Sequence, residues 1–474
     1  MDELWASLAF VRADVVFAAS LVIAALVTVH VLLRKREVES SAGWIGFAWF
    51  APVIGGISYF LFGVNRVQRR ARRLRPSADR RGGRAAWPSP IEDDHLDPLE
   101  RGIGRITGRP VMPGNAVQTF RDGDEAYPAM LAAIAAAQRS VGLSSYIFHN
   151  DEWGGRFIDA LAAAQLRGVA VRVLIDGIGG GWLLSPAYHR LRREGVPAAR
   201  FLHSPLPWHM PFLNLRSHKK ILVLDGSSGF TGGMNISDAN VLATHPSEPV
   251  QDTHFRVEGP VAGQLTEAFA QDWAFATNED LQGEAWFPDA KAAGAVSARV
   301  IDSGPDEDLE KIEFAILQAV ACARESVAVM TPYFLPDERL TTALALASMR
   351  GVAVDVVVPE TSDHVFMDWA TRANIGPLLK DGVRIWLCPP PFRHSKTTVV
   401  DGEWCLIGSC NWDIRSFRLN FELCLEIYDR GLAGTLTELI QRWRGSALTQ
   451  ADLDARTLPV RLRDAGARLM LPYL

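Results

Sequence analysis

Residues 218–225 read His-Lys-Lys-Ile-Leu-Val-Leu-Asp, and residues 394–401 read His-Ser-Lys-Thr-Thr-Val-Val-Asp. Six residues after each Asp comes a short segment that begins with Gly and ends with Asn, at positions 232–235 and 408–411. Both copies fit the pattern H-x-K-x4-D-x6-G-[GS]-x-N. The identical spacing indicates a duplicated unit, and we expect one site that is assembled from both copies.

Each copy predicts a β-strand that carries an anion-binding face. The residues after the His are apolar or β-branched, and each copy ends at an Asp-Gly turn signal. Alternate residues on a strand share a face. His218 and Lys220 therefore point the same way, as do His394 and Lys396. An imidazole beside an ammonium is suited to an anionic group such as phosphate.

The two copies supply the candidate site residues. The candidate catalytic set consists of the motif residues His218, Lys220, Asp225, His394, Lys396 and Asp401. Asp225 and Asp401 lie seven positions from their His, on the opposite face of the strand, so we expect them to be structural. The candidate phosphate-binding residues lie in the turns that follow the motifs, and they are Gly233, Asn235, Ser409 and Asn411.

Lysine is rare in this chain, yet both motif cations are lysines. By count, 7 of the 49 basic residues are Lys. A compact ammonium is a flexible point charge, whereas guanidinium is a planar fork. The usage predicts that the two positions require the point charge.

A carboxylate begins the strand that follows each motif, at Asp252 and at Glu422. A carboxylate in this place could accept a hydrogen bond from an imidazole N–H and fix its tautomer. A side chain that caps a loop at the start of a strand fits the sequence equally well.

Composition limits the classes of protein that fit. The length of 474 residues suits about three domains. The five Cys form no C-x-x-C pair, which favours reduced thiols over a disulfide framework, and no His/Cys cluster has zinc spacing. Residues 1–75 carry a net charge of +5 by count, so the remainder carries −10 of the total −5. Such an acidic remainder argues against a general nucleic-acid binder.

Two N-terminal stretches are free of charge, at residues 15–33 and 40–65. Each is long enough to span a bilayer as a helix, and we expect residues 1–65 to form a two-helix transmembrane hairpin. Two alternatives remain. Both stretches could be buried core helices, or the second could be partly re-entrant, because Pro52 and Gly55-Gly56 lie in its middle.

A basic segment follows the hairpin. Residues 66–75 contain six Arg and no acidic residue, which predicts a cytoplasmic location for this end and an attraction to anionic lipid headgroups. With two spans, the basic residues 34–36 would lie outside, against the same rule. Residues 76–100 are rich in Pro, Gly and charge, so residues 66–110 are interpreted as a basic juxtamembrane segment and linker.

The rest of the chain predicts a duplicated α/β fold. Helical and strand patterns alternate, which is typical of βαβ units. The predicted helices and strands cover residues 126–139, 140–148, 154–167 and 169–175 and then residues 313–324, 326–335, 339–350 and 352–358. The predicted domains are residues 111–290 and 291–474.

With these residues in place, the chain resembles the phospholipase D superfamily, and within it the bacterial cardiolipin synthases of the phospholipase D type. The resemblance covers nearly the whole length. Outside the motifs it rests on Trp44, Pro52, Gly55, Tyr59, Gly63, residues 214–217, 231–235, Asp413, Arg415, Ser416, residues 420–422 and residues 471–474. One departure is Gln251, where an aromatic residue is expected before Asp252, and it should affect packing more than chemistry.

The resemblance implies two tandem α/β/α sandwich domains related by a pseudo-twofold axis, and an enzyme of the bacterial inner (cell) membrane. The enzyme would be multi-pass, with its catalytic domains facing the cytoplasm. It would transfer a phosphatidyl group from one phosphatidylglycerol to another through a phosphatidyl-histidine, releasing glycerol. One motif His would attack phosphorus, His218 by family analogy, and the other would exchange protons.

The same resemblance implies no metal and no cofactor, because two ammoniums supply the positive charge. The expected partners are phosphatidylglycerol and anionic membrane lipid, and no nucleic acid. A membrane-anchored phospholipase D-type hydrolase or transphosphatidylase would use the same residues and remains an alternative. A membrane-tethered nuclease is a second alternative.

Overall fold

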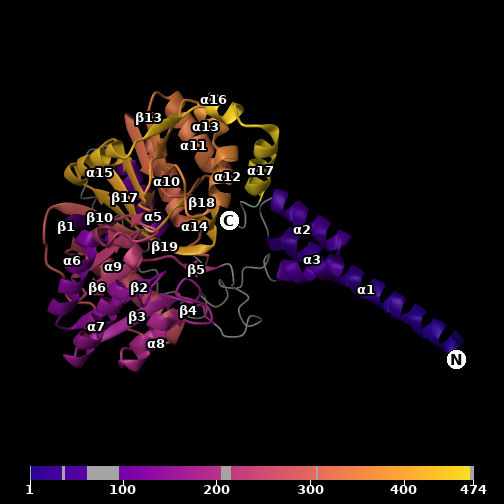
Figure 1. Cartoon of the computed structure of the whole chain (residues 1–474), viewed down its shortest axis with the longest axis horizontal. Coiled ribbons are helices and arrows are strands. Elements are labelled where there is room, and N and C mark those ends of the chain that lie inside the picture. The colour runs from indigo at the N-terminus through magenta and orange to yellow at the C-terminus, as the bar shows by residue number, and fades with distance from the viewer. Residues whose placement is uncertain (1, 35–37, 61–94, 204–214, 306–307, 470–474) are drawn as a thin grey trace. The chain divides into compact units, whose positions relative to one another are not determined.

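The computed structural model describes residues 2–34, 38–60, 95–203, 215–305 and 308–469 (Figure 1). The chain divides into two compact units. In the described residues, the N-terminal unit comprises residues 2–60 and the main unit comprises residues 95–469. The basic run at residues 66–75 and most of the predicted linker lie outside the described residues.

The N-terminal unit contains a helix that could cross a membrane. Within helix α1 (Asp2–Arg34), the 20-residue stretch Asp14–Leu33 reaches a mean hydropathy of 2.6. At 1.5 Å per residue this stretch is about 30 Å long, which matches the hydrocarbon core of a bilayer. In the described part of the chain, no other helix is both long and apolar enough.

Over its described residues, which end at residue 60, the second apolar segment is not one continuous helix, so the structure supports the expected two-helix hairpin only in part. It forms two short helices, α2 (Val38–Phe50) and α3 (Pro52–Ser58). The backbone of Ala51 leaves the helical region at φ −137° and ψ 74°, and Pro52 begins the new helix, where its missing N–H costs no bond. A Cβ at Gly55 would lie 2.7 Å from the carbonyl oxygen of Phe47, so α3 folds back onto the last turn of α2.

The folded-back segment packs against only part of α1. A Cβ at Gly56 would lie 2.4 Å from the side chain of Ile23. Trp49 Nε1 donates to Thr28 Oγ1 at 3.0 Å, and His30 Nδ1 lies 2.7 Å from Tyr59 Oη. These contacts fall on residues 23–30 of α1. They favour the re-entrant alternative for the second segment.

The described part of the main unit is organised around one sixteen-stranded sheet (Figure 1). The first half of the sheet runs in the order β4 (Ala198–Phe201), β3 (Ala170–Asp176), β2 (Ser140–Ser145), β6 (Ile221–Leu224), β7 (Ser228–Gly232), β9 (Thr253–Glu258) and β1 (Met112–Arg121). The second half runs in the order β14 (Arg384–Cys388), β13 (Ala353–Pro359), β11 (Ser326–Met330), β16 (Thr397–Val400), β17 (Trp404–Gly408), β19 (Asn420–Tyr428) and β10 (Val296–Ser303), with β20 (Ser446–Leu448) beyond β14.

The two halves repeat one topology. Strands β2 and β3 are parallel, as are β11 and β13, while β6 and β16 run antiparallel to their neighbours. The halves join where β1 pairs antiparallel with β10. A pseudo-twofold axis through this pair relates the halves, so the predicted duplication is confirmed. The domain boundary at residues 290/291 stays a prediction, because the sheet is continuous across the junction.

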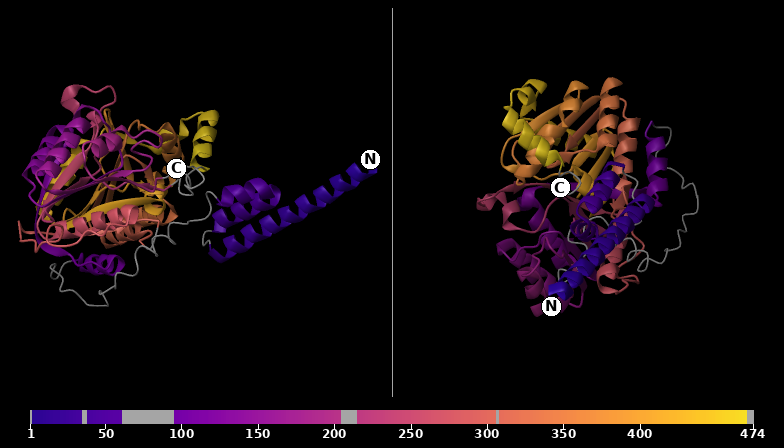
Figure 2. Two further views of the ribbon diagram at one scale, coloured as in Figure 1. Left: turned by 90° about the horizontal axis from the view of Figure 1, so that it is seen from below. Right: turned by 90° about the vertical axis from the view of Figure 1, so that its right-hand side faces the viewer.

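Helices cover both faces of the sheet (Figure 2). In the first half these are α6 (Asp122–Ala136), α7 (Glu152–Leu166) and α8 (Pro186–Arg193) on one face and α9 (Val261–Thr277) on the other. Strand β2 shows the reason. Val141 and Leu143 belong to the core beneath α6 and α7, whereas a Cβ at Gly142 would lie 2.5 Å from Phe269 of α9.

The second half has the same arrangement, with additions. Helices α10 (Lys311–Cys322), α11 (Glu338–Met349), α12 (Val365–Asn374) and α13 (Gly376–Lys380) follow the pattern of the first half, and α15 (Arg430–Arg442) corresponds to α9. The remaining elements are α5 (Asp97–Thr107), η3 (Asp238–Asn240), η4 (Leu242–Thr244), β12 (Phe334–Leu335), β18 (Trp412–Asp413), α14 (Ile414–Arg418), α16 (Gln450–Asp454) and α17 (Leu458–Leu469). The predicted helices and strands exist with ends shifted by a few residues, except that the predicted strand at residues 326–335 is divided into β11 and β12. The motif strands are shorter than predicted, because they begin only at Ile221 and Thr397, after the His and Lys.

Candidate active site

The two motif imidazoles lie together at the centre of the main unit. His218 and His394 immediately precede the buried strands β6 and β16, with Lys220 and Lys396 between. The ring centroids of His218 and His394 are 6.3 Å apart, and the ring planes meet at 81°. Both imidazoles and both lysines are buried. The structure therefore brings the two sequence copies into one site.

Short strands that cross between the halves place the imidazoles. Strand β5 (Arg216–Ser217) pairs parallel with the start of β19, and strand β15 (Phe392–Arg393) pairs parallel with β8 (Val250–Gln251). As a result, the backbone N–H of His218 donates to the Phe421 carbonyl at 2.8 Å. The N–H of His394 donates to the Gln251 carbonyl at 2.7 Å. Gln251 thus contributes through its backbone, which accounts for the tolerated departure from an aromatic side chain.

Each imidazole contacts the carboxylate of the other half. His218 Nδ1 lies 3.1 Å from the Glu422 carboxylate, and His394 Nδ1 lies 2.9 Å from Asp252 Oδ2. His218 Nδ1 also lies 3.0 Å from the carbonyl oxygen of Ser409. Acceptors at Nδ1 favour the tautomer with the proton on that atom, which leaves Nε2 for the reaction.

The two carboxylates differ in charge state. Burial raises the pKa of Glu422 to about 7, although the charges of the nearby lysines and hydrogen bonds from Ser409 and Asn420 oppose the shift. Burial acts on Asp252 in the same direction, but the hydrogen bond from His394 and the charge of Lys396 outweigh it and lower the pKa of Asp252. Asp252 is therefore the more firmly ionised partner at neutral pH.

Burial disfavours the protonated forms of both imidazoles, but to different extents. Burial, followed by the charge of Lys220, holds the pKa of His218 well below its usual range. Burial and the charge of Lys396 also lower the pKa of His394, but its hydrogen bond to Asp252 opposes that shift. His218 is therefore suited to be an unprotonated nucleophile, and His394 is the imidazole whose protonated form has an ionised partner.

The pKa values of the two lysines are lowered toward neutral pH. Lys220 Nζ donates to the His218 carbonyl at 2.7 Å, and Lys396 Nζ donates to the His394 carbonyl. Burial lowers the pKa of Lys220 to about 7 and that of Lys396 to about 8. An anion bound between them would favour both ammonium forms.

The residues of the two Gly-containing turns lie close to this centre but face different partners. Asn411 is buried, and its Oδ1 has no hydrogen-bond partner among the described residues, whereas Asn235 Oδ1 accepts from the Ile147 N–H at 3.3 Å. Ser409 Oγ donates to Glu422 at 2.5 Å. At Gly233, a Cβ would lie 2.6 Å from Asp252. Ser409 and Gly233 therefore sit against the two carboxylates, which the expected phosphate-binding role does not explain.

Asp225 and Asp401 bind backbone N–H groups just after the motif strands, and their place in the catalytic set stays a prediction. Each ends the motif strand with a positive φ, 51° and 52°. Asp225 accepts from the backbone N–H groups of residues 138–140, and Asp401 accepts from those of residues 324–326. These side chains fix the end of each motif strand, directly after β6 or β16, in keeping with the structural role expected of them.

Tyr146 and Asp176 were missed by sequence reasoning as parts of the site. The Tyr146 ring centroid is 5.1 Å from that of His218 and 5.4 Å from Lys220 Nζ. Asp176 Oδ2 accepts from the Ser217 N–H at 2.7 Å, directly before His218. The sequence carried a weak signal, because Tyr146 and Tyr333 both follow within three residues of the ends of β2 and β11.

Comparisons with known proteins agree with this geometry. The chain matches the family described as cardiolipin synthase, phospholipase D-like domain, over residues 130–273 and 316–444, and a phospholipase D-nuclease N-terminal family over residues 22–63. The major cardiolipin synthase of Bacillus subtilis is 31% identical over 472 residues, covering 95% of this chain and 96% of that protein. Cardiolipin synthase 2 of Staphylococcus epidermidis is 30% identical over 461 residues, covering 94% of each chain.

A solved structure shares the fold. Phosphatidylserine synthase of Haemophilus influenzae superposes with a TM-score of 0.59 at 15% identity, covering 80% of this chain and all of that one. The family matches cover both halves of the sheet and include both pairs of His and Lys. The chain belongs to the phospholipase D superfamily, in its family of bacterial cardiolipin synthases.

Proposed function

We propose that this protein transfers a phosphatidyl group from one phosphatidylglycerol to the glycerol hydroxyl of another, yielding cardiolipin and glycerol. The observation that carries the proposal is the facing pair of imidazoles, one from each half, with Nδ1 of each against a carboxylate of the other half and two buried lysines beside them. Such a pair suits two successive displacements at one phosphorus atom. The similarity to cardiolipin synthases over 94–95% of the chain supports the choice of lipid.

In the first displacement, His218 Nε2 attacks phosphorus and the bond between phosphorus and the glycerol oxygen breaks. Protonated His394 gives its proton to the leaving oxygen, and glycerol departs. The ionised Asp252 stabilises the imidazolium of His394 until that transfer. Lys220 and Lys396 stabilise the negative charge that spreads over the other phosphate oxygens. The product is a phosphatidyl-histidine at residue 218.

In the second displacement, the now neutral His394 removes a proton from the glycerol hydroxyl of a second phosphatidylglycerol. The oxygen attacks phosphorus, the bond between phosphorus and His218 Nε2 breaks, and cardiolipin is released. The proton that His394 gains restores the starting state, so protons balance over the cycle. Asn235 and Asn411 are the proposed amide donors to the phosphate oxygens.

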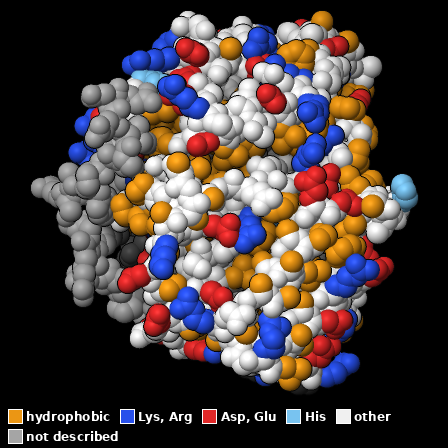
Figure 3. All heavy atoms as spheres, turned by 90° about the vertical axis from the view of Figure 1, so that its left-hand side faces the viewer, with side chains coloured by type: hydrophobic (Ala, Val, Ile, Leu, Met, Phe, Trp, Pro, Cys, Tyr) orange, Lys and Arg blue, Asp and Glu red, His pale blue; other side chains and the backbone are white. Residues whose placement is uncertain are grey.

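A lipid substrate fits the chain better than nucleic acid does. On the face of the main unit shown in Figure 3, Lys and Arg are mixed with Asp, Glu and hydrophobic side chains, and no continuous basic field is visible on that face. Non-specific binding to nucleic acid depends on such a field. The apolar stretch of α1 in turn suits an enzyme that works at a membrane.

We further propose that the main unit faces the cytoplasm and that α1 alone crosses the bilayer. If α2 and α3 re-enter from the cytoplasmic side, residues 34–36 and the six Arg of residues 66–75 lie on that same side. Both clusters then obey the positive-inside rule, which a two-span hairpin violates at residues 34–36. The acidic N-terminus, with Asp2 and Glu3, would lie outside.

The test is the product formed by the full chain. We expect expression in a bacterial strain that lacks cardiolipin to restore it, and the purified protein in phosphatidylglycerol vesicles to release one glycerol per cardiolipin. The His218→Ala variant should form neither product. Phosphatidic acid with no cardiolipin would instead show that water is the acceptor and would overturn the proposal in favour of a hydrolase.

A further inference from the structure

The edge of the sheet that leads to the imidazoles carries exposed apolar side chains in both halves. In the first half, Leu183 and Leu184 follow β3 and are 71% and 78% exposed. In the second half, Val365 and Phe366 follow β13 and are 50% and 58% exposed. We name these pairs the first lip and the second lip. They follow equivalent strands of the duplicated unit, at the carboxyl ends of parallel strands, where α/β sheets bind ligands.

The first lip is fixed to the region of His218. A Cβ at Gly179, in the same loop, would lie 2.5 Å from the ring of Tyr146, which itself contacts His218. Asp176 accepts from the N–H groups of residues 178 and 179 at 2.9 and 2.8 Å. Arg200 donates to the carbonyl oxygens of residues 177, 181 and 182. These hydrogen bonds fix the conformation of the loop before the first lip. Its two leucines, Leu183 and Leu184, are exposed to solvent.

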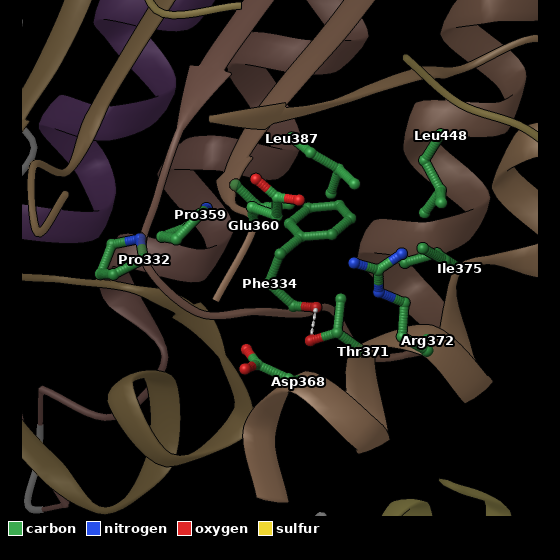
Figure 4. A pocket seen from close by; sticks show the side chains of 11 residues that line it. Pro332, Phe334, Pro359, Glu360, Asp368, Thr371, Arg372, Ile375, Leu387 and Leu448 are labelled. Carbon is green, nitrogen blue, oxygen red and sulfur yellow. Dashed lines mark hydrogen bonds between the residues drawn. The ribbon is translucent and has the colours of Figure 1, made fainter. Parts of the chain in front are cut away.

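The second lip is connected to His394 through aromatic rings. The centroid of Phe392 lies 5.8 Å from that of His394, and Tyr333 lies 6.3 Å from Phe392. Tyr333 stacks on His364, directly before the lip, at 5.7 Å. The inner face of α12 is occupied, because Asp368, Thr371 and Arg372 turn toward a small pocket beside Phe334 (Figure 4). Val365 and Phe366 therefore lie on the outer, solvent-exposed side of α12.

Helix α17 extends the apolar surface of the second lip. It packs on α12, where Arg463 lies 4.2 Å from the ring of Trp369, which contacts Phe366. Three exposed leucines follow a helical spacing of four and seven residues, so they lie on one face, the α17 ridge. They are Leu458, Leu462 and Leu469.

The charges on α17 complement an anionic surface. Arg461, Arg463 and Arg468 are exposed, whereas its one acidic residue, Asp464, is buried and paired with Arg456 and Arg463. A helix with exposed leucines and arginines is typical of segments that lie in the interface of an anionic bilayer. A bilayer is also within reach of this unit at all times, because α1 anchors the same chain.

We propose that the two lips and the α17 ridge dock the main unit onto an anionic lipid bilayer, with the active site opening between the lips. The inference rests on the proposed function only for its substrate, phosphatidylglycerol. Docking would bring the lipid phosphate to the imidazoles without removing the whole lipid from the membrane. Each apolar side chain that enters the bilayer interface adds to the binding of the unit.

The direct test uses spin labels in the full chain, reconstituted in vesicles of phosphatidylglycerol and a neutral lipid, with the partly exposed Cys322 changed to Ser. Labels are placed by Leu184→Cys, Phe366→Cys or Leu462→Cys. The matched control is Met349→Cys on α11, which is also exposed and apolar. We expect oxygen, enriched in the bilayer, to relax the three lip and ridge labels, and a water-soluble nickel reagent to relax only the control.

Two results would overturn the proposal. If the nickel reagent reaches the lip labels as readily as the control, the lips stay in water. If neither reagent reaches them, protein covers the surface. Neither result depends on turnover. Docking can therefore be established even if the proposed function fails, and the proposed function can be established even if docking fails.

Activity gives a second measurement. The paired variant Leu183→Ser/Leu184→Ser and the variant Phe366→Ser should lose about tenfold or more in turnover of bilayer phosphatidylglycerol. Both should turn over a short-chain, monomeric phosphatidylglycerol within about twofold of wild type. The control Leu346→Ser should behave as wild type on both substrates. Equal losses on the two substrates would point to damage of the site and would contradict docking.

Discussion

At the level of single residues, the site depends on two imidazoles that act on one phosphorus atom. We predict that His218→Ala and His394→Ala each lower turnover about 10³-fold or more, and that the double variant is no worse, because groups that act as a unit are not additive. The measurement is the initial rate of glycerol release in vesicles. A single variant that keeps a large part of the activity would show that the two motifs work separately.

The two lysines give the enzyme a pH dependence of known sign. With pKa values of about 7 and about 8, Lys220 and Lys396 are protonated below these values and neutral above them. We therefore expect the attraction for the phosphate to be lost as pH rises through 7 to 8, and the apparent KM for phosphatidylglycerol to rise severalfold by pH 9. A flat KM across this range would contradict the shifted pKa values.

An Arg substitution at residue 220 or 396 distinguishes the effect of the positive charge from the effect of the shape of the group that carries it. Arg stays protonated at all these pH values, so in Lys220→Arg or Lys396→Arg the rise of KM with pH should weaken. The planar guanidinium cannot occupy the place of a point charge, and we expect kcat to fall about 10²-fold or more. The variants should keep the apparent melting temperature of the wild type in detergent. Near-normal kcat in both would show that the choice of Lys has no catalytic reason.

At the level of elements, the crossing strand pairs β5–β19 and β8–β15 determine which carboxylate serves which imidazole. We predict that Asp252→Asn lowers kcat about 10- to 100-fold and shifts the acid limb of the pH profile, because the imidazolium of His394 loses its charged partner. Gln251→Ala is the matched control. It should stay within about twofold of wild type, since only the Gln251 backbone is used.

The bend between α2 and α3 makes a topological prediction. If α1 alone spans the membrane, a membrane-impermeant thiol reagent should label Asp2→Cys in cells whose outer surface is accessible and should leave Glu37→Cys unlabelled. A two-span hairpin gives the reverse pattern, since the N-terminus would then be inside and residue 37 outside. Permeabilised cells provide the control, in which both positions should react.

At the level of the whole molecule, the main unit is one continuous sheet whose halves share a site. We expect strands near the junction, β1 and β10, to lose hydrogen-exchange protection at the same denaturant concentration as β6 and β16, because contacts across the axis couple the halves. Mass spectrometry of exchanged peptides measures this. If one half loses protection well before the other, the halves unfold as independent domains.

The amino-acid sequence by itself determined the parts of this protein that depend on local spacing. Two motif copies with one internal spacing indicated the duplication, the buried strands and a site built from His218, Lys220, His394 and Lys396. Alternation along a strand also assigned Asp225 and Asp401 to the face away from the imidazoles. Composition and an uncharged stretch of membrane length indicated α1. In each case the informative residues are neighbours in the chain, where strand and helix geometry is fixed.

Only the tertiary structure decided how distant residues meet. Glu422 lies 204 positions from His218, and Asp252 lies 142 positions from His394. No local pattern states that each carboxylate serves the imidazole of the other half, because this follows from strand pairing across the pseudo-twofold axis. The bend at Ala51, the contact of Tyr146 with His218 and the exposed lips also depend on packing between separate elements. That packing is settled by burial over the whole chain, and the spacing of residues in sequence does not encode it.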